Sequence, residues 1–223
     1  MSNIENKNTT GPASKKSGFI EENQKSLGFI LVGIIVLVLL YFGYQQFYLS
    51  PRAEKAAAEM FKAEEYAAID SLRAKAIAGD GSFSGFEEIA KEYNNTKSAN
   101  IANAYLGGLY LREGKFQEAI NSLEKYSETG SQILDPLVLG MMGDAYSELN
   151  DYDKAINYYK KAADKNKNSF TAPLMLKKLG LVYEAQNNNQ AALDAYKKIV
   201  SDFPNSQEAN AVQALIARVE AKL

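Results

Sequence analysis

The side chains of this chain that could do chemistry are carboxylates, lysines and tyrosines, because its 223 residues include no histidine and no cysteine. Histidine is the usual general base at neutral pH, so a Ser-His-Asp arrangement cannot be built. Two adjacent carboxylate pairs remain, Glu64-Glu65 and Glu87-Glu88. Consecutive residues on a helix do not face each other, so these pairs are expected to be solvated surface. We therefore expect no enzyme, no catalytic residue and no cofactor.

Metal, nucleic-acid and small-molecule sites are not indicated either. The segment Gly79-Asp80-Gly81 lacks the alternating acidic ligands of a calcium loop and is predicted to be a turn that ends a helix. The charge is nearly balanced, with 25 Lys and Arg against 27 Asp and Glu. No basic face is visible, which argues against nucleic acid as a partner. The remaining partner class is other proteins.

One stretch of the chain is apolar enough to lie in a membrane. No residue between Lys25 and Arg52 is charged, and residues 27–44 are almost wholly Leu, Ile, Val, Phe and Gly. In hydrocarbon such a run must be helical, and at about 1.5 Å per residue it covers roughly 27 Å, close to the bilayer core. A buried core helix would rarely be apolar on all sides. A cleaved signal peptide would be shorter and end at a small-x-small site, whereas YLSPR follows here. The sequence predicts a transmembrane signal anchor over residues 26–49.

The segments next to this anchor differ in composition. Residues 1–25 are rich in Asn, Ser, Thr and Lys and are expected to be disordered. Residues 50–79 are rich in alanine and are predicted to form one long juxtamembrane helix, which the glycines at 79–81 end. Lysines precede the anchor, and Arg52, Lys55 and Lys62 follow it, so the positive-inside rule is close to a tie.

Internal periodicity is the most specific pattern in the sequence. Three segments superimpose without gaps, and their glycines Gly107, Gly143 and Gly180 lie 36 and then 37 residues apart. The first has Leu106, Gly107, Tyr110, Gly114, Phe116, Ala119, Ile120 and Leu123; the second has Met142, Gly143, Tyr146, Asn150, Tyr152, Ala155, Ile156 and Tyr159; the third has Leu179, Gly180, Tyr183, Asn187, Asn189, Ala192, Leu193 and Tyr196.

The repeated positions have physical roles in a pair of packed helices. The glycine on the first helix and the alanine on the second leave room for close packing. Gly114, Asn150 and Asn187 would end the first helix, because Gly and Asn adopt the left-handed conformation at least cost. A partial copy precedes the repeats, with Thr96 and its counterpart Ser206 predicted to cap the helices that follow them.

This pattern resembles the tetratricopeptide repeat (TPR), which has a period of about 34 residues. The chain departs from the family pattern in having Asn189 at an aromatic position and no tryptophan. The resemblance implies an all-α solenoid. It predicts a partial repeat over residues 80–99, three repeats over 100–206 and a capping helix over 207–223, with Ala211, Leu215 and Val219 on the packed face of that helix.

The resemblance also implies a concave groove lined by five positions of each first helix, which would be the partner-binding surface. These positions are Ile101, Ala104, Gly108, Leu111 and Arg112 in the first repeat; Leu137, Gly140, Asp144, Ser147 and Glu148 in the second; and Leu174, Lys177, Leu181, Glu184 and Ala185 in the third. Lys177 alone is suited to the basic clamp by which some TPR domains grip carboxylates. The mixed, partly apolar groove suits a helix or an extended segment instead.

Taken along its length, the chain resembles the YfgM-type proteins, ancillary subunits of the bacterial Sec translocon. That resemblance implies a single-pass protein of the bacterial inner membrane with a cytoplasmic N-terminus and a periplasmic TPR domain. Its partners would be the translocon, periplasmic chaperones or subunits of an envelope complex. Two alternatives stay open: a subunit that recruits a cell-envelope enzyme, and an import receptor that faces the cytosol.

Overall fold

The computed structural model describes residues 23–223, so nearly all of the tail predicted over residues 1–25 lies outside the described residues. The chain divides into two compact units, Met1–Ser50 and Pro51–Leu223. Every regular element among the described residues is a helix, apart from an isolated bridge between Gly79 and Ser84. The all-α fold class is confirmed.

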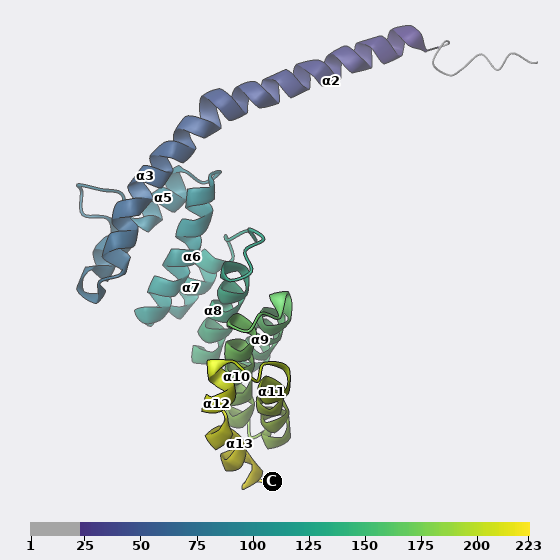
Figure 1. Ribbon diagram of the computed structural model, residues 1–223. Coiled ribbons are helices and arrows are strands. Elements are labelled where there is room, and N and C mark those ends of the chain that lie inside the picture. Colours follow the sequence, from purple (N-terminus) through teal and green to yellow (C-terminus); the bar gives the residue numbers. More distant parts are fainter. Residues whose placement is uncertain (1–22) are drawn as a thin grey trace, which may run out of the picture. The chain divides into compact units, whose positions relative to one another are not determined.

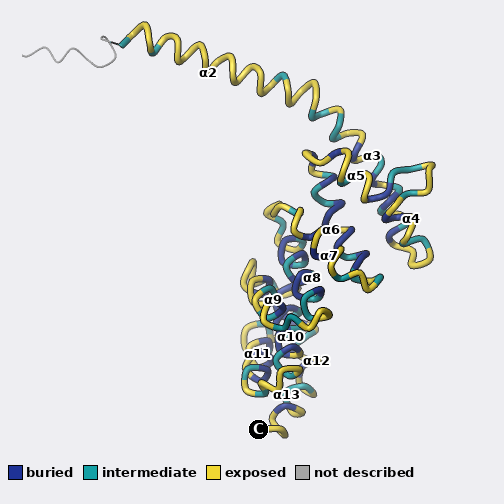
Figure 2. Tube along the Cα trace, turned by 180° about the vertical axis from the view of Figure 1, so that it is seen from behind, coloured by how far each residue is buried: buried dark blue, intermediate teal, exposed yellow. Residues whose placement is uncertain are grey.

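The first unit holds α2 (Gln24–Tyr44) and the π-helical turn η1 (Gln45–Leu49) (Figure 1). Its most apolar window has a mean hydropathy of 2.6, and none of that window is buried. Figure 2 shows α2 exposed along nearly its whole length. The continuous helical stretch Gln24–Ala67, which contains α2, is the one helix among the described residues that length and composition would allow to cross a membrane.

The second unit begins within α3 (Ser50–Ala67), which packs through a stripe of three alanines and one methionine. Ala56, Met60, Ala63 and Ala67 recur at helical spacing and are all buried. They belong to one hydrophobic cluster with Phe86 and the residues around it. The alanine-rich composition therefore serves tertiary packing as well as helix propensity.

The prediction of a single helix over residues 50–79 is wrong in its second half. After α3, Ile69 is extended (φ −112°, ψ 115°), and the 3-10 turn η2 (Asp70–Leu72) leads into α4 (Arg73–Ala78). A straight continuation would carry Ile77 about 15 Å beyond Ala67. The turn instead lets Ile77 reach the core, where it is 6% exposed. Burial decides this break, because the local sequence favours helix throughout.

The next helix, α5 (Phe86–Glu92), belongs to the region predicted as a partial repeat. Phe86 and Ile89 of this helix are both fully buried. Thr96 caps the helix that follows α5, as the sequence predicts, because its hydroxyl accepts a hydrogen bond from the Ala99 amide at 3.2 Å.

Three helix pairs then stack one after another (Figure 1). The first helix of each pair is α6 (Lys97–Arg112), α8 (Leu134–Glu148) or α10 (Thr171–Ala185), and the second is α7 (Phe116–Leu123), α9 (Tyr152–Asn166) or α11 (Asn189–Asp202). Gly114, Asn150 and Asn187 end the first helices with φ of 73°, 60° and 57°. The predicted left-handed positions are confirmed, and they turn each first helix back onto its partner.

The chain ends in two short helices, α12 (Gln207–Ala211) and α13 (Gln213–Glu220), rather than one capping helix over 207–223. Ser206 caps α12 as predicted, at 3.2 Å from the Ala209 amide. Ala209, Val212 and Val219 are buried, whereas Ala211 is exposed, contrary to expectation. The expected positions (Ala211, Leu215 and Val219) and the buried positions (Ala209, Val212 and Val219) are both compatible with one face of a helix. Periodicity alone therefore could not select the face that packs on α10 and α11.

Candidate partner-binding groove

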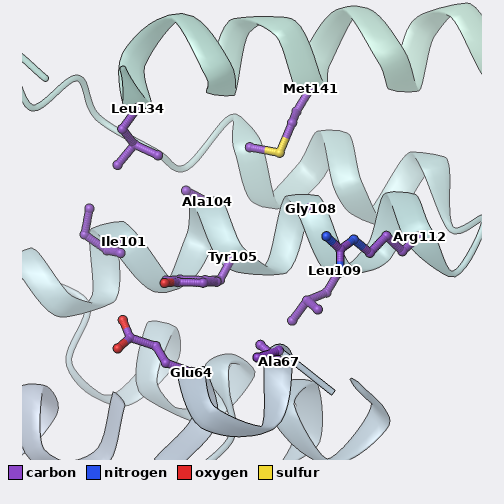
Figure 3. A pocket seen from close by; sticks show the side chains of 11 residues that line it. Glu64, Ala67, Ile101, Ala104, Tyr105, Gly108, Leu109, Arg112, Leu134 and Met141 are labelled. Atoms are coloured by element: carbon purple, nitrogen blue, oxygen red, sulfur yellow. The ribbon is translucent and has the colours of Figure 1, made fainter. Parts of the chain in front are cut away.

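Helix α3 and the first helices of the first two repeats line an open cavity of about 580 Å³, which we call the N-terminal pocket. Its walls come from α3, α6 and α8 (Figure 3). The lining residues are Glu64, Ala67, Ala68, Ile101, Ala104, Tyr105, Gly108, Leu109, Arg112, Leu134 and Met141. The pocket is thus apolar except for two charged side chains and a tyrosine hydroxyl.

A glycine sets the spacing between two walls of the N-terminal pocket. A Cβ built on Gly108 of α6 would lie 3.3 Å from the sulfur of Met141 on α8. The missing side chain therefore lets α8 approach α6 while the flexible thioether fills the floor between them. Gly108 was predicted for the groove from its repeat position.

Tyr105 forms a rigid wall of the N-terminal pocket. Its ring stacks on Phe86, with centroids 4.7 Å apart and planes 6° from parallel. Its hydroxyl end lies toward Glu64 (Figure 3). Burial, together with the nearby Glu64 carboxylate, raises the pKa of Tyr105 above its usual value. Tyr105 therefore stays protonated at neutral pH and offers both a ring face and a hydroxyl.

The two charges of the N-terminal pocket lie toward opposite ends of it. Glu64 lies beside Ile101 and Tyr105, whereas Arg112 directs its guanidinium group back over Leu109 (Figure 3). No ion pair within the described residues involves the Arg112 side chain. The arginine is exposed and its charge is available to a ligand.

A second cavity of about 460 Å³, the C-terminal pocket, lies between α8 and α10. Lys178 Nζ donates hydrogen bonds to both carboxylate oxygens of Asp144 in this pocket, each at 2.6 Å. The Tyr159 hydroxyl donates to Asp144 Oδ1 at 2.6 Å as well. Glu148 lines the same pocket, is exposed and forms no ion pair among residues 23–223.

The groove positions of the third repeat are engaged by the C-terminal helices. Glu184 binds Arg218 at 2.6 Å and Lys222 at 3.3 Å, and it accepts a hydrogen bond from the Tyr196 hydroxyl at 2.8 Å. Burial alone would raise the pKa of Glu184, but these three bonds outweigh it and lower that pKa. Lys177 lies 3.7 Å from Glu208 of α12. A partner would have to compete with these contacts.

The predicted groove residues therefore fall into different environments. Ile101 and Arg112 line the N-terminal pocket, and Asp144, Glu148 and Leu181 line the C-terminal pocket. Leu111, Leu137 and Leu174 are half-buried against the hydrophobic clusters and line neither of these two pockets.

Several pocket residues were missed by reasoning from the repeat. Tyr105, Leu109 and Met141 lie on first helices, but outside the five groove positions. Glu64 and Ala67 come from α3, which carries no repeat pattern. The available signal in the sequence was the helical spacing of Ala56, Ala63 and Ala67, which is typical of a helix that packs closely on a neighbour.

The described residues were compared with the side-chain groups that hold metal ions in proteins. Residues 23–223 contain no group of three or more His, Cys, Asp or Glu side chains placed to hold a metal ion. What the groove offers to a partner is an apolar floor and a few charged side chains.

The helical-repeat architecture was compared with curated proteins, solved structures and family models. Comparison with curated proteins gives no significant match. Among solved structures, the crystal structure of BtubC (BKLC) from P. vanneervenii is similar, with 14% sequence identity and a TM-score of 0.48 over 78% of this chain and 92% of that one. Nothing about function follows from a likeness at this level.

Comparison with family models is more specific. One model described as "Tetratricopeptide repeat" matches residues 141–218, and another with the same description matches residues 97–168. The two matches cover all three observed helix pairs and most of the C-terminal helices. Together they span more than half of the chain, which belongs to the tetratricopeptide-repeat family.

Proposed function

We propose that this chain is a membrane-anchored adaptor, which holds partner proteins at the bacterial inner membrane and catalyses no reaction itself. TPR domains serve as scaffolds that bind other proteins, and two family matches support that role here. The observation that carries the proposal is the combination of an apolar helix that has no buried residue with an open, largely apolar groove.

The anchoring part of the proposal rests on α2. An apolar helix with no buried residue has no protein core to occupy, so a bilayer is the environment that suits it. Tyr41, Phe42, Tyr44, Phe47 and Tyr48 gather at its C-terminal end, where aromatic rings favour the headgroup region.

We further propose that the N-terminus is cytoplasmic and that the TPR domain is periplasmic. Four lysines precede the uncharged stretch that begins at Ser26, against Arg52, Lys55 and Lys62 shortly after it. The excess is small, but a long domain can translocate behind an N-terminal anchor largely regardless of its charge. The resemblance to YfgM-type proteins supports the same orientation.

The process we propose is protein export or envelope assembly. In that setting the partners would be the translocon, periplasmic chaperones or subunits of an envelope complex. A subunit that recruits a cell-envelope enzyme would use the same groove and anchor. A cytosol-facing receptor would reverse the topology.

Two measurements test the anchor and its orientation. Carbonate extraction of native membranes should leave the uncleaved chain in the pellet, whereas a mature protein that begins after Ser50 would contradict the anchor. Protease added to intact spheroplasts should digest the TPR domain. A protected domain would instead support the cytosol-facing receptor.

The partner class is tested separately. Photo-crosslinkers placed at Ile101 in the groove and at Lys161 on α9 compare two surfaces in the native membrane. Crosslinks to export or envelope proteins that form from Ile101 only would support the proposal. Crosslinks from neither position to any membrane or periplasmic protein would contradict it.

A further inference from the structure

We propose that the N-terminal pocket binds a partner segment in which apolar side chains adjoin one acidic residue, and that this acid pairs with Arg112. The inference names the partner chemistry of the groove and so rests on the proposed adaptor function. It commits to a peptide segment of another protein as the occupant.

The floor of the N-terminal pocket supplies the apolar part of the recognition. Ile101, Leu109 and Met141 line it, and Leu109 is 4% exposed, so the floor is fixed by the core beneath it. Tyr105 stands beside this floor, held in place by its stack on Phe86. A preformed apolar wall costs little conformational entropy on binding, and exposed tyrosines are frequent anchors at interfaces.

The cation of the N-terminal pocket sets the charge of the ligand. Arg112 is the one basic residue that lines it, and its guanidinium group points toward the middle of the pocket (Figure 3). The other basic groups near the groove are occupied, since Lys178 is held by Asp144 and Arg218 by Glu184. A guanidinium group pairs with a carboxylate through two parallel hydrogen bonds, so an acidic side chain is its natural partner.

The second charge of the N-terminal pocket restricts where the acid can lie. Glu64 is at the Tyr105 end, away from Arg112 (Figure 3). A ligand carboxylate placed beside Glu64 would meet a like charge with an apolar surface on one side. We therefore expect a segment that is acidic at one end and neutral or basic at the other.

The wall contributed by α3 lies outside the matched repeats. Glu64, Ala67 and Ala68 belong to α3 or lie just after it, whereas the family matches begin only at residue 97. The repeats alone would leave this side of the pocket open. The segment that joins the anchor to the repeats thus helps to form the binding surface.

The proposal is tested with the full chain in nanodiscs of zwitterionic lipid. Three fluorescent synthetic peptides share one apolar segment and differ only in their first residue, which is Glu, Gln or Lys. Anisotropy should give the order Glu, then Gln, then Lys from tightest to weakest. The Arg112→Glu variant should invert that order, with the Glu peptide weakened about tenfold, because attraction is replaced by repulsion. Arg112→Gln should bind all three peptides about equally.

The matched control is Lys161→Glu, the same change of charge at an exposed position of α9. It should leave the order of the three peptides as in the unmodified chain. An unchanged order in Arg112→Glu, an equal inversion in Lys161→Glu, or no binding of any peptide would each overturn the proposal. The adaptor function would survive these results if native crosslinking still found an export or envelope partner, so the two failures are distinguishable.

Discussion

The ring of Tyr159 on α9 lies directly over Gly143 on α8. A Cβ placed on that glycine would be 2.6 Å from the ring Cε1, and the tyrosine hydroxyl continues past it to donate to Asp144. Gly180 and Tyr196 repeat the arrangement one repeat later. A glycine inside a helix costs about 0.5–1 kcal/mol relative to alanine, so its recurrence here indicates a steric need that outweighs propensity.

Replacing this glycine should destabilise the repeat domain. Gly143→Leu would force a branched side chain into the space of a ring that is itself 3% exposed and cannot move aside. Overpacking of this kind costs about 1–3 kcal/mol, which thermal unfolding of the full chain would register as a lower Tm. Ala214→Leu, at an exposed position of α13, is the matched control and should leave the Tm nearly unchanged. Equal melting of the two variants would mean that the contact is not as described.

A second prediction concerns Asp135, which is 2% exposed and holds the loop between α7 and α8. It accepts hydrogen bonds from the Tyr126 hydroxyl at 2.6 Å and from the amides of Thr129 and Gly130 at 3.0 and 2.9 Å. Asp135→Asn should lower the free energy of unfolding at neutral pH by about 1–3 kcal/mol, because an amide cannot accept all of these bonds. Asp164→Asn changes an exposed carboxyl and should have little effect.

The same carboxyl should make stability fall in acid. Burial tends to raise the pKa of Asp135, but the hydrogen bonds from Tyr126, Thr129 and Gly130 outweigh it and lower that pKa. The stabilisation is therefore complete above the unfolded pKa of about 3.9 and is lost as pH falls through the lower folded pKa. Urea unfolding at a series of pH values should show this loss in the parent chain and a smaller one in Asp135→Asn. Parallel curves would contradict the assignment.

At the alkaline side, Tyr93 should make stability fall with rising pH. Burial, aided by a hydrogen bond to Glu59 Oε1 at 2.9 Å, raises its pKa from 10.0 to about 12. The unfolded chain loses this proton first, so the stabilisation is present below pH 10 and disappears as pH rises through about 12. Tyr93→Phe should reduce the slope of stability against pH in this interval. Tyr152→Phe, a partly exposed tyrosine, is the control.

The C-terminal helices should depend on Glu184. Glu184→Gln weakens the pairs with Arg218 and Lys222 and should loosen α12 and α13, since hydrogen bonds to charged groups contribute about 1.5–3 kcal/mol. Hydrogen exchange of amides in Gln213–Glu220 should accelerate, while amides of α6 keep their rates. Glu118→Gln, an exposed change on α7, should affect neither set. Unchanged exchange in α13 would show that its apolar contacts suffice.

Much of the repeat architecture could be predicted because each repeated position has a local physical role. Asn150 and Asn187 adopt left-handed backbone conformations, Thr96 and Ser206 cap helices, and such roles can be inferred from residue type and spacing. The apolar stretch of α2 is equally local, since its length and composition are properties of consecutive residues. The groove was predicted only in part, because its positions came from the repeat alone.

Sequence by itself therefore determined the helical class, the register of the three repeats and the candidate anchor. Only the tertiary structure decided that the chain turns at Ile69, that α3 walls the N-terminal pocket, and that Glu184 is bound to Arg218 rather than left for a partner. The physical reason is the separation along the sequence of the residues that interact. Turns, caps and periodicity depend on neighbours within a few residues. The break after α3 depends instead on the core that Ile77 joins, and the Glu184 ion pair links side chains 34 positions apart, so both form only when the helices pack.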